Sequence, residues 1–211
     1  MLKDVIILTK SAKHKKYCVA GVDFHSGSWV RLVSSDEDAR GALSPYDMRT
    51  KDGGYCEPLD LVSVEVEKAV PQGCQTENFL IVYGRPWIKH RKSTIEEVVR
   101  IHRPTTRSYI FGNDKPFIPG IDWMKYSLLL AEVTQLEIYQ NEGGKSKANF
   151  IYKNHRYNGI SLTDPVYFGW KSETVIEKAY IVVSIPNDPY EGKYYKFIAK
   201  IFPVKDFFGN R

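Results

Sequence analysis

The residues of this chain whose types and spacing best suit chemistry lie close to its start. Residues 10–16, KSAKHKK, carry four lysines and one histidine within seven positions. On a loop between two strands, the flexible side chains of Lys13, His14 and Lys16 could neutralise phosphates and release their counterions. A solvated surface loop would have the same composition. The stretch therefore predicts either a contact with a polyanion or a plain surface loop.

The same region holds the best candidates for catalysis. His14 could serve as a general acid or base, and Cys18 could serve as a nucleophile. Cys18 lies inside an apolar run, however, where a free cysteine usually fills space in a core. The sequence has no G-x-S-x-G motif, no glycine-rich phosphate loop and no cluster of metal ligands. We expect no catalytic residue, no cofactor and no metal, and keep an enzyme that uses His14 as an alternative.

A second basic segment lies near the middle of the chain. From Arg85 to Arg107 there are seven lysines or arginines and only two acidic residues. Within it, Arg85, Lys89 and Arg91 surround Trp87. Cations beside an aromatic ring are typical of proteins that bind single-stranded nucleic acid, because bases stack on the ring while the cations follow the backbone. These four residues are therefore candidate contacts.

Trp29 and Arg31 form a further candidate pair. Residues two apart on a strand share a face, so the WVR sequence places both side chains on one side of a sheet. On an exposed face they would offer a stacking ring and a cation together. On a buried face, Arg31 would instead pair with Asp23 or Asp60. Both interpretations stay open at the level of the sequence.

The elements that must position these residues are mostly strands. Many short runs are rich in β-branched and aromatic residues, and turn clusters separate them. Val62, Val64 and Val66 alternate with polar residues, as a half-exposed antiparallel strand requires. These features favour a mainly β chain built as a barrel or sandwich. The expected strands are 5–9, 17–24, 29–33, 60–70, 79–83, 127–139, 148–157, 176–185 and 194–202.

Helix signals are few, and they help to divide the chain. The clearest is 93–102, where Ser93 or Thr94 can cap and two glutamates suit the first turn. A weaker candidate, 35–44, is a turn or a short helix. The proline-rich segment 86–125 differs from its surroundings and predicts a connector between two β-units, 1–85 and 126–211. CVAGV (18–22) and FIAKI (197–201) suggest a distant duplication.

Composition limits the class of protein. The 211 residues are 43% hydrophobic and 26% charged, which is typical of a globular chain with a core. The formal net charge of +5 is compatible with a polyanionic partner. Three cysteines without C-x-x-C spacing favour reduced thiols and a cytoplasmic protein. No apolar run approaches the roughly 20 residues of a membrane span, and we interpret the N-terminus as a strand and not a signal peptide.

Several motifs resemble those of one known family. In the first half they are S-x-K-H (11–14), C-V-A-G (18–21), G-S-W-V-R (27–31), P-L-D (58–60) and Q-T-E-N (75–78). In the second half they are L-T-D-P (162–165) and the closing segment 183–202. Together they are similar to the prokaryotic dual OB-containing domain (DuOB) family. One departure is Ile185-Pro186, where that family's pattern leads us to expect Leu-Gly.

The resemblance implies two tandem OB-like β-barrels with one or two short helices. The first barrel would span 1–85 and the second 126–211, with the helix and the proline-rich connector at 86–125. It also implies nucleic-acid binding and a link to prokaryotic defence or mobile-element systems, and it supplies no catalytic residues. The matched positions Ser11, Lys13, His14, Trp29 and Arg31 become site candidates.

The resulting hypothesis is a cytoplasmic module that binds single-stranded DNA or RNA. Its candidate contacts are Ser11, Lys13, His14, Lys16, Trp29, Arg31, Arg85, Trp87, Lys89 and Arg91. The first alternative is a protein-interaction or structural module in which the motif residues hold the barrels together. The second is an enzyme that acts on a nucleotide or nucleic acid through His14.

Overall fold

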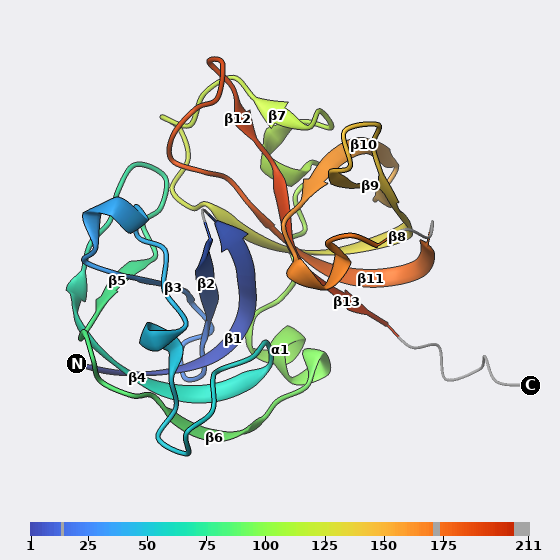
Figure 1. Ribbon diagram of the computed structural model, residues 1–211. Helices are drawn as coiled ribbons and strands as arrows, with labels where there is room; N and C mark the ends of the chain where they lie inside the picture. The colour runs from blue at the N-terminus through green and yellow to red at the C-terminus, as the bar shows by residue number, and fades with distance from the viewer. Residues whose placement is uncertain (14, 171–173, 205–211) are drawn as a thin grey trace, which may run out of the picture.

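The computed structural model describes residues 1–13, 15–170 and 174–204 of the chain. Figure 1 shows two groups of strands side by side, one coloured from blue to green and the other from yellow to red. The protein is therefore mainly β, as its strand-rich sequence predicts. Among the described residues, no helix has the length and apolar character needed to cross a membrane.

The first half of the chain forms a six-stranded sheet in the order β1-β2-β3-β5-β4-β6. An additional pairing between β1 and β4 closes five of these strands into a ring, and β6 pairs with the first residues of β4. The pair β3 and β5 is parallel, whereas the other neighbours are antiparallel. The strands are β1 (Leu2–Lys13), β2 (Lys16–Asp23), β3 (Trp29–Val33), β4 (Asp60–Ala69), β5 (Asn78–Ile81) and β6 (Ile88–Lys92).

The second half forms a closed barrel in the order β10-β13-β11-β8-β9. Here β10 and β13 form the parallel pair. A short two-stranded sheet of β7 and β12 lies beside this barrel. The strands are β7 (Phe117–Ile118), β8 (Leu128–Gln140), β9 (Ser146–Tyr152), β10 (His155–Leu162), β11 (Thr174–Ser184), β12 (Tyr194–Tyr195) and β13 (Phe197–Pro203).

Both rings follow the same course through space. Counting the ring strands of each half in chain order, the first, second, third, fifth and fourth are successive neighbours in both. This is the Greek-key order of the five-stranded OB barrel. The similarity between 18–22 and 197–201 does not reflect the repeat, because these residues lie in the second strand of one ring and the fifth strand of the other.

The helix expected at 93–102 is confirmed as α1 (Ile95–Ile101). Thr94 caps it, because its side-chain oxygen accepts a hydrogen bond from the backbone N–H of Glu97 at 3.2 Å. The segment 35–44 contains only a 3₁₀ turn, η1. The 3₁₀ turns are η1 (Glu37–Ala39), η2 (Tyr46–Met48), η3 (Ile110–Gly112) and η4 (Pro165–Tyr167).

Two differences from the expected strands have simple physical causes. Strand β6 was not expected, because all five of its side chains are exposed and no apolar alternation marks it. The expected strand 148–157 is two strands, β9 and β10, joined by a turn at Lys153 and Asn154. The Asn158-Gly159 pair, which signals a turn, lies instead at a bulge inside β10.

Apolar side chains fill both rings and the space between them. The first core gathers residues of β1 to β5 with Met48, Cys56 and Trp87, and the second gathers residues of β8 to β13 with Ile110 and Phe111. The segment expected as a connector is thus packed against the barrels. A further apolar cluster joins the two barrels, and its fully or nearly buried members are Ile6, Leu8, Ala20, Val22, Leu61, Ile95, Val98, Leu128, Leu130, Val182, Ala199 and Phe202.

Candidate functional site in the cleft between the barrels

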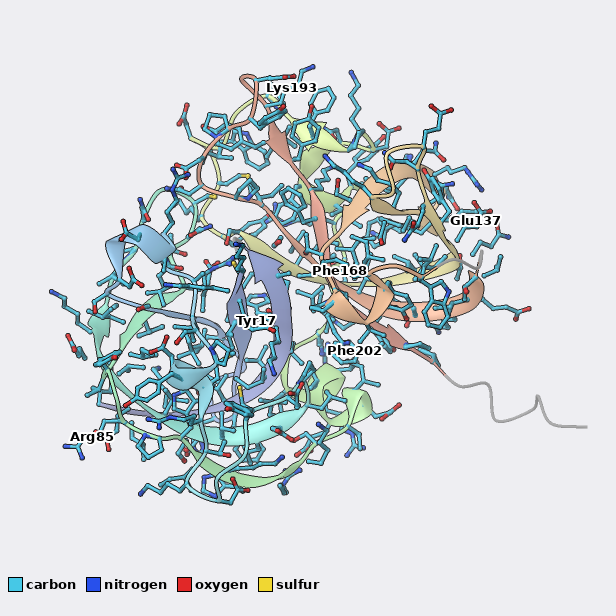
Figure 2. The ribbon with its side chains drawn as sticks, viewed as in Figure 1. Tyr17, Arg85, Glu137, Phe168, Lys193 and Phe202 are labelled. Atoms are coloured by element: carbon cyan, nitrogen blue, oxygen red, sulfur yellow. The ribbon has the colours of Figure 1, made fainter. Side chains whose placement is uncertain are left out.

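The outer face of β1 and β2 in the first barrel is covered by the second barrel. Ile6 and Val22 belong to one apolar cluster with Leu130 and Val182, and all four side chains are buried. Figure 2 shows Phe202, from β13, near the junction. OB barrels commonly bind oligonucleotides through the face of their second and third strands. In the first barrel, much of that face is therefore occupied by the second barrel.

Trp29 lies at the edge of this junction. Its half-buried ring packs against the inter-barrel cluster and makes a T-shaped contact with the His102 ring, with ring centroids 4.9 Å apart. Burial lowers the pKa of His102, and its Nδ1–H donates to the backbone oxygen of Gly27 at 2.7 Å. A Cβ at Gly27 would lie 2.1 Å from the backbone oxygen of Ile101, so only glycine fits there. Trp29 thus belongs to a contact that holds the β2–β3 turn against the end of α1.

Arg31 forms a buried ion pair within the first barrel, and Ser127, just before β8, connects this pair to the second barrel. Its Nε and Nη2 donate to Glu77 Oε1 at 3.4 and 3.3 Å, and Nη2 also donates to Ser127 Oγ at 2.7 Å. Ser127 donates in turn to Glu77 Oε1. The prediction that a buried Arg31 would pair with Asp23 or Asp60 is wrong. Glu77 is the partner because it directly precedes β5, the parallel neighbour of β3.

A cleft of about 1070 Å³ lies beside this ion pair, with walls from both barrels. The first barrel contributes the β1–β2 hairpin, the strands β3 and β5, and the β4–β5 loop. The second contributes the end of β11 and the segment that leads to β13. The lining residues fall at 11, 12 and 18, between 31 and 41, between 70 and 80, at 163, and between 184 and 197.

The floor of the cleft is the outer face of β3 and β5. Arg31 pairs in register with Asn78, and Val33 pairs in register with Leu80. All four line the cleft. Leu32, which lies between Arg31 and Val33 on β3, also borders it, but its buried side chain packs in the barrel core. The floor thus combines two polar side chains at one end with two apolar side chains at the other.

The opposite wall of the cleft comes from the segment 184–197. Tyr190, Lys193 and Tyr195 line it, and Figure 2 shows Lys193 at the top of the molecule. The Lys193 ammonium lies 4.6 Å from the centre of the Phe117 ring. Aromatic and cationic groups therefore share this wall.

Two contacts join the walls. The backbone N–H of Ala12 donates to the oxygen of Thr163 at 3.1 Å. At Gly73, in the β4–β5 loop, an added Cβ would lie 2.1 Å from Asn187 Oδ1, which shows how closely the two loops approach. The relative position of the two barrels therefore sets the width of the cleft.

Two buried acceptor atoms on residues that line the cleft have no hydrogen-bond partner among the described residues. They are Oδ1 of Asn78 and Oδ1 of Asn187. Native proteins pair most buried polar atoms, because an unpaired one keeps its desolvation penalty without compensation. Both atoms have almost no solvent-accessible surface, and Oδ1 of Asn187 is packed against Gly73.

Part of the basic stretch 10–16 lies in or beside this cleft. Residues 11–13 belong to β1 and Lys16 to β2, so the strands continue through a stretch that we expected to be a loop. Ser11 is buried and lines the cleft. Lys16 pairs with Asp36, which also lines the cleft, and this hydrogen bond lowers the pKa of Asp36. His14 and the side chain of Lys13 lie outside the described residues.

Trp87 does not stack on an open surface. Its side chain is 2% exposed and packs in the core of the first barrel. A base cannot reach a ring in that position. The prediction that Trp87 contacts nucleic acid therefore does not fit the folded structure.

The cations around Trp87 are exposed, but each has an acidic partner. Figure 2 shows Arg85 at the lower left of the molecule, on the side of the first barrel away from the second. None of the cleft-lining residues comes from this segment. The ion pairs are Arg85 with Glu65 at 3.9 Å, Lys89 with Asp60 at 3.0 Å, and Arg91 with Glu97.

Sequence reasoning missed several residues of the cleft. Asn78 lines the cleft and Glu77 holds the neighbouring Arg31, and both lie in the Q-T-E-N motif, which carried the family resemblance without a stated role. Asn187 and Tyr190 lie in the closing segment 183–202, which also served only for the family resemblance. A motif that combines a carboxylate and an amide before a strand was the signal that could have found the first two.

The described residues contain no group of three or more His, Cys, Asp or Glu side chains that could hold a metal ion. Cys18 lines the cleft, and Cys56 and Cys74 are buried free thiols. Burial raises the pKa of Cys56 to about 12, which keeps that thiol protonated and unreactive at neutral pH.

Comparison with known proteins agrees with the fold. No curated protein matches the chain. The model of the dual OB-containing domain family matches residues 3–201, which is nearly the whole chain. A dual OB-containing domain should hold two OB barrels, and the structure has two five-stranded rings of identical strand order. The chain therefore belongs to the dual OB-containing domain (DuOB) family.

Proposed function

We propose that the protein binds single-stranded nucleic acid in the cleft between its two barrels. The observation that carries this proposal is the position of the cleft. The β1–β2 hairpin and the β4–β5 loop of the first barrel both line it. These are the two loops by which OB barrels hold oligonucleotides, beside the face of their second and third strands.

The size and chemistry of the cleft support the same ligand. Its volume of about 1070 Å³ is at or above the roughly 300–1,000 Å³ of small-molecule pockets. The side chains of Tyr190 and Tyr195 offer rings on which bases can stack. Lys193 and Arg40, also in the lining, offer cations to the phosphates.

The candidate contacts divide under this proposal. Ser11, Lys16 and Arg31 lie in or beside the cleft and remain candidate contacts. Lys13 and His14 remain candidates on the basis of the sequence alone. Trp29 and Arg31 also hold the two barrels together, which is the role that the structural alternative assigns to them. The enzyme alternative has one supporting observation, Cys18 in the lining.

The link to prokaryotic defence or mobile-element systems is a separate part of the proposal. The family resemblance supports it, and the cleft does not depend on it. The genes beside the one that encodes this chain would test it. Neighbours that encode nucleases or mobile-element proteins are expected, and a neighbourhood of metabolic enzymes would contradict it.

Charge reversal at the cleft tests the binding proposal. We expect Lys193→Glu to weaken the binding of a labelled single-stranded oligonucleotide by about fivefold, on the order of 1 kcal/mol for an exposed charge contact. The slope of log K against log salt should become shallower by about 0.7, because one phosphate contact is lost. Fluorescence anisotropy with DNA and RNA single strands and with duplexes, at 50 and 200 mM salt, measures both quantities.

Arg85→Glu is the matched control, since it reverses another exposed cation, on the far side of the first barrel. Its affinity should remain within twofold of the unchanged protein. If the two variants lose affinity equally, the cleft is not the binding surface. If no single strand binds at 50 mM salt, the proposed function is wrong.

A further inference from the structure

We propose that a single strand bound in the cleft continues across the outer face of the second barrel, so that the two barrels hold one strand in series. The inference rests on the proposed function and adds to it the path of the ligand. It is carried by a row of side chains that starts in the cleft and crosses β10, β9 and β8.

The pairing between neighbouring strands defines this row. Phe197, which lines the cleft, pairs in register with Ser161 of β10. Ser161 pairs in register with Lys147 of β9, and Lys147 pairs in register with Tyr139 of β8. Three steps of about 4.8 Å between neighbouring strands separate the backbone of Tyr139 from that of Phe197 by roughly 14 Å. The row therefore leads out of the cleft and across the barrel.

All four side chains of the row lie on the outer face. Successive residues of a strand point to opposite sides, and the core of the second barrel holds their chain neighbours Ile138, Ala148, Leu162 and Ile198. Each of the four row residues is half-buried, and none belongs to the apolar cluster that joins the barrels. Figure 1 shows β9 and β10 at the upper right, on the side away from the first barrel. This face is therefore open to a ligand that leaves the cleft.

Lys147 supplies a cation in the middle of the row. Its Nζ donates to Ser161 Oγ at 2.8 Å, and it makes no ion pair among the described residues. Burial, together with the nearby Lys145 ammonium, lowers the pKa of Lys147. A phosphate oxygen would supply the missing counter-charge, since lysine binds phosphate as a point charge.

Tyr139 supplies a ring at the end of the row. Its hydroxyl donates to Asn149 Oδ1 on β9 at 3.4 Å and lies 3.9 Å from the position that a Cβ on Gly159 of β10 would take. The side chain therefore extends from β8 across β9, with its ring along the sheet. A base can stack on such a ring whatever its sequence context. The nearby acid Glu137 is paired with Arg156, so its charge is compensated.

The test compares two thymidine strands, a short strand of about 4 nucleotides and a long strand of about 12, within the range of sites on OB barrels. Fluorescence anisotropy should show about tenfold tighter binding of the long strand. The reason is that only the long strand reaches β9 and β8, where it gains a phosphate contact and a stacked base.

Charge reversal at Lys147 connects this gain to the row. Lys147→Glu should weaken binding of the long strand about fivefold and of the short strand less than about twofold. The slope of log K against log salt for the long strand should become shallower by about 0.7. Lys153→Glu reverses an exposed cation in the turn at the opposite end of β9 and is the matched control. It should leave both affinities within about twofold of those of the unchanged protein.

Variants of Tyr139 separate stacking from a structural role. Tyr139→Leu removes the ring and should weaken binding of the long strand about tenfold. Tyr139→Phe keeps the ring and loses only the hydroxyl contact with Asn149, so it should bind the long strand within about twofold of the unchanged protein. Equal losses in the two variants would overturn the role of the ring. Thermal melting of each variant checks that it folds.

The outcomes separate the two proposals. Equal affinity for the short and the long strand overturns the continuation and leaves the proposed function standing. A gain with length that Lys147→Glu leaves intact overturns the assignment to this row. A loss of binding in Lys147→Glu without any loss in Lys193→Glu would place the ligand on the outer face alone. That result overturns both the cleft as the binding site and the continuation from it.

Discussion

The two barrels share one strand order, but their outer faces have different surroundings. In the first barrel, Ile6 and Val22 on the outer side of β1 and β2 are buried against the second barrel. In the second barrel, the outer side of β9 and β10 faces solvent and carries polar residues. There Arg156 Nη2 donates to Glu137 Oε2 at 2.9 Å, and Figure 2 shows Glu137 at the outer edge of the molecule.

The strand topology of an OB barrel therefore does not by itself locate the face that binds a ligand. The strand face that an isolated OB barrel would offer is largely covered in the first barrel, whereas its loops remain open at the cleft. The same packing that covers the face also builds the cleft, because the second barrel supplies its other wall. The ion pairs differ in the same way. Arg31 and Glu77 in the first barrel form a buried pair, whereas Arg156 and Glu137 in the second form an exposed one.

Removing the glutamate from each of these ion pairs should give the largest difference in stability between the two barrels. We expect Glu77→Ala to lower the free energy of unfolding by about 3–5 kcal/mol, because it leaves the buried Arg31 charge uncompensated. Glu137→Ala, which breaks the exposed pair with Arg156, should cost less than about 1 kcal/mol. Urea denaturation of both variants measures the difference. Equal losses would mean that the Arg31–Glu77 ion pair is not buried in solution.

Apolar contacts between the barrels should give the next largest effect. Leu130 is 1% exposed in the inter-barrel cluster, and Leu130→Ala should lower the free energy of unfolding by about 2–5 kcal/mol. Val175, on the neighbouring strand β11, is 67% exposed. Val175→Ala should change the stability by less than about 0.5 kcal/mol. A mild effect of Leu130→Ala in urea denaturation would show that the barrels separate easily.

A pH effect should distinguish the buried charges of the two barrels. Arg31 in the first has a carboxylate partner, whereas Lys196 in the second is 1% exposed and donates to neutral acceptors, the backbone and side-chain oxygens of Asn113. Burial lowers the pKa of Lys196 to about 7, from its ordinary value of 10.5. Between pH 7 and 10.5 the unfolded chain therefore binds more protons at this group than the folded chain.

The stability should accordingly rise with pH in that window, since the cost of burying the charged lysine disappears as the folded protein loses the proton. We expect a gain of about 1–2 kcal/mol between pH 7 and pH 9, measured by urea denaturation. Lys196→Met should remove this rise. A rise that persists in Lys196→Met would assign it to other groups.

The strands were the most predictable part of the structure. Val62, Val64 and Val66 alternate with polar residues, and they lie in β4 with their side chains in the first core. The helix α1 begins after Thr94, where the capping signal placed it. Strand β6 escaped prediction because its exposed side chains carry no apolar pattern.

The candidate site was less predictable, for a physical reason that Trp87 illustrates. Its basic neighbours suggested a surface ring, but Trp87 fills the core of the first barrel while its neighbours turn outward. Asn78 and Asn187 are 109 positions apart in the chain and line one cleft only because the two barrels pack together. A pattern of neighbouring residues in the sequence does not show that two such distant segments come together.

By itself, the sequence determined the strand-rich character of the chain, its main helix and the two-residue spacing that puts Trp29 and Arg31 on one face. Only the tertiary structure decided what lies opposite that face. Trp29 meets His102, and Arg31 meets Glu77 and Ser127 at the border of the cleft. The reason is that alternation along a strand specifies which side chains share a side, whereas the partner of that side is set by packing between distant segments.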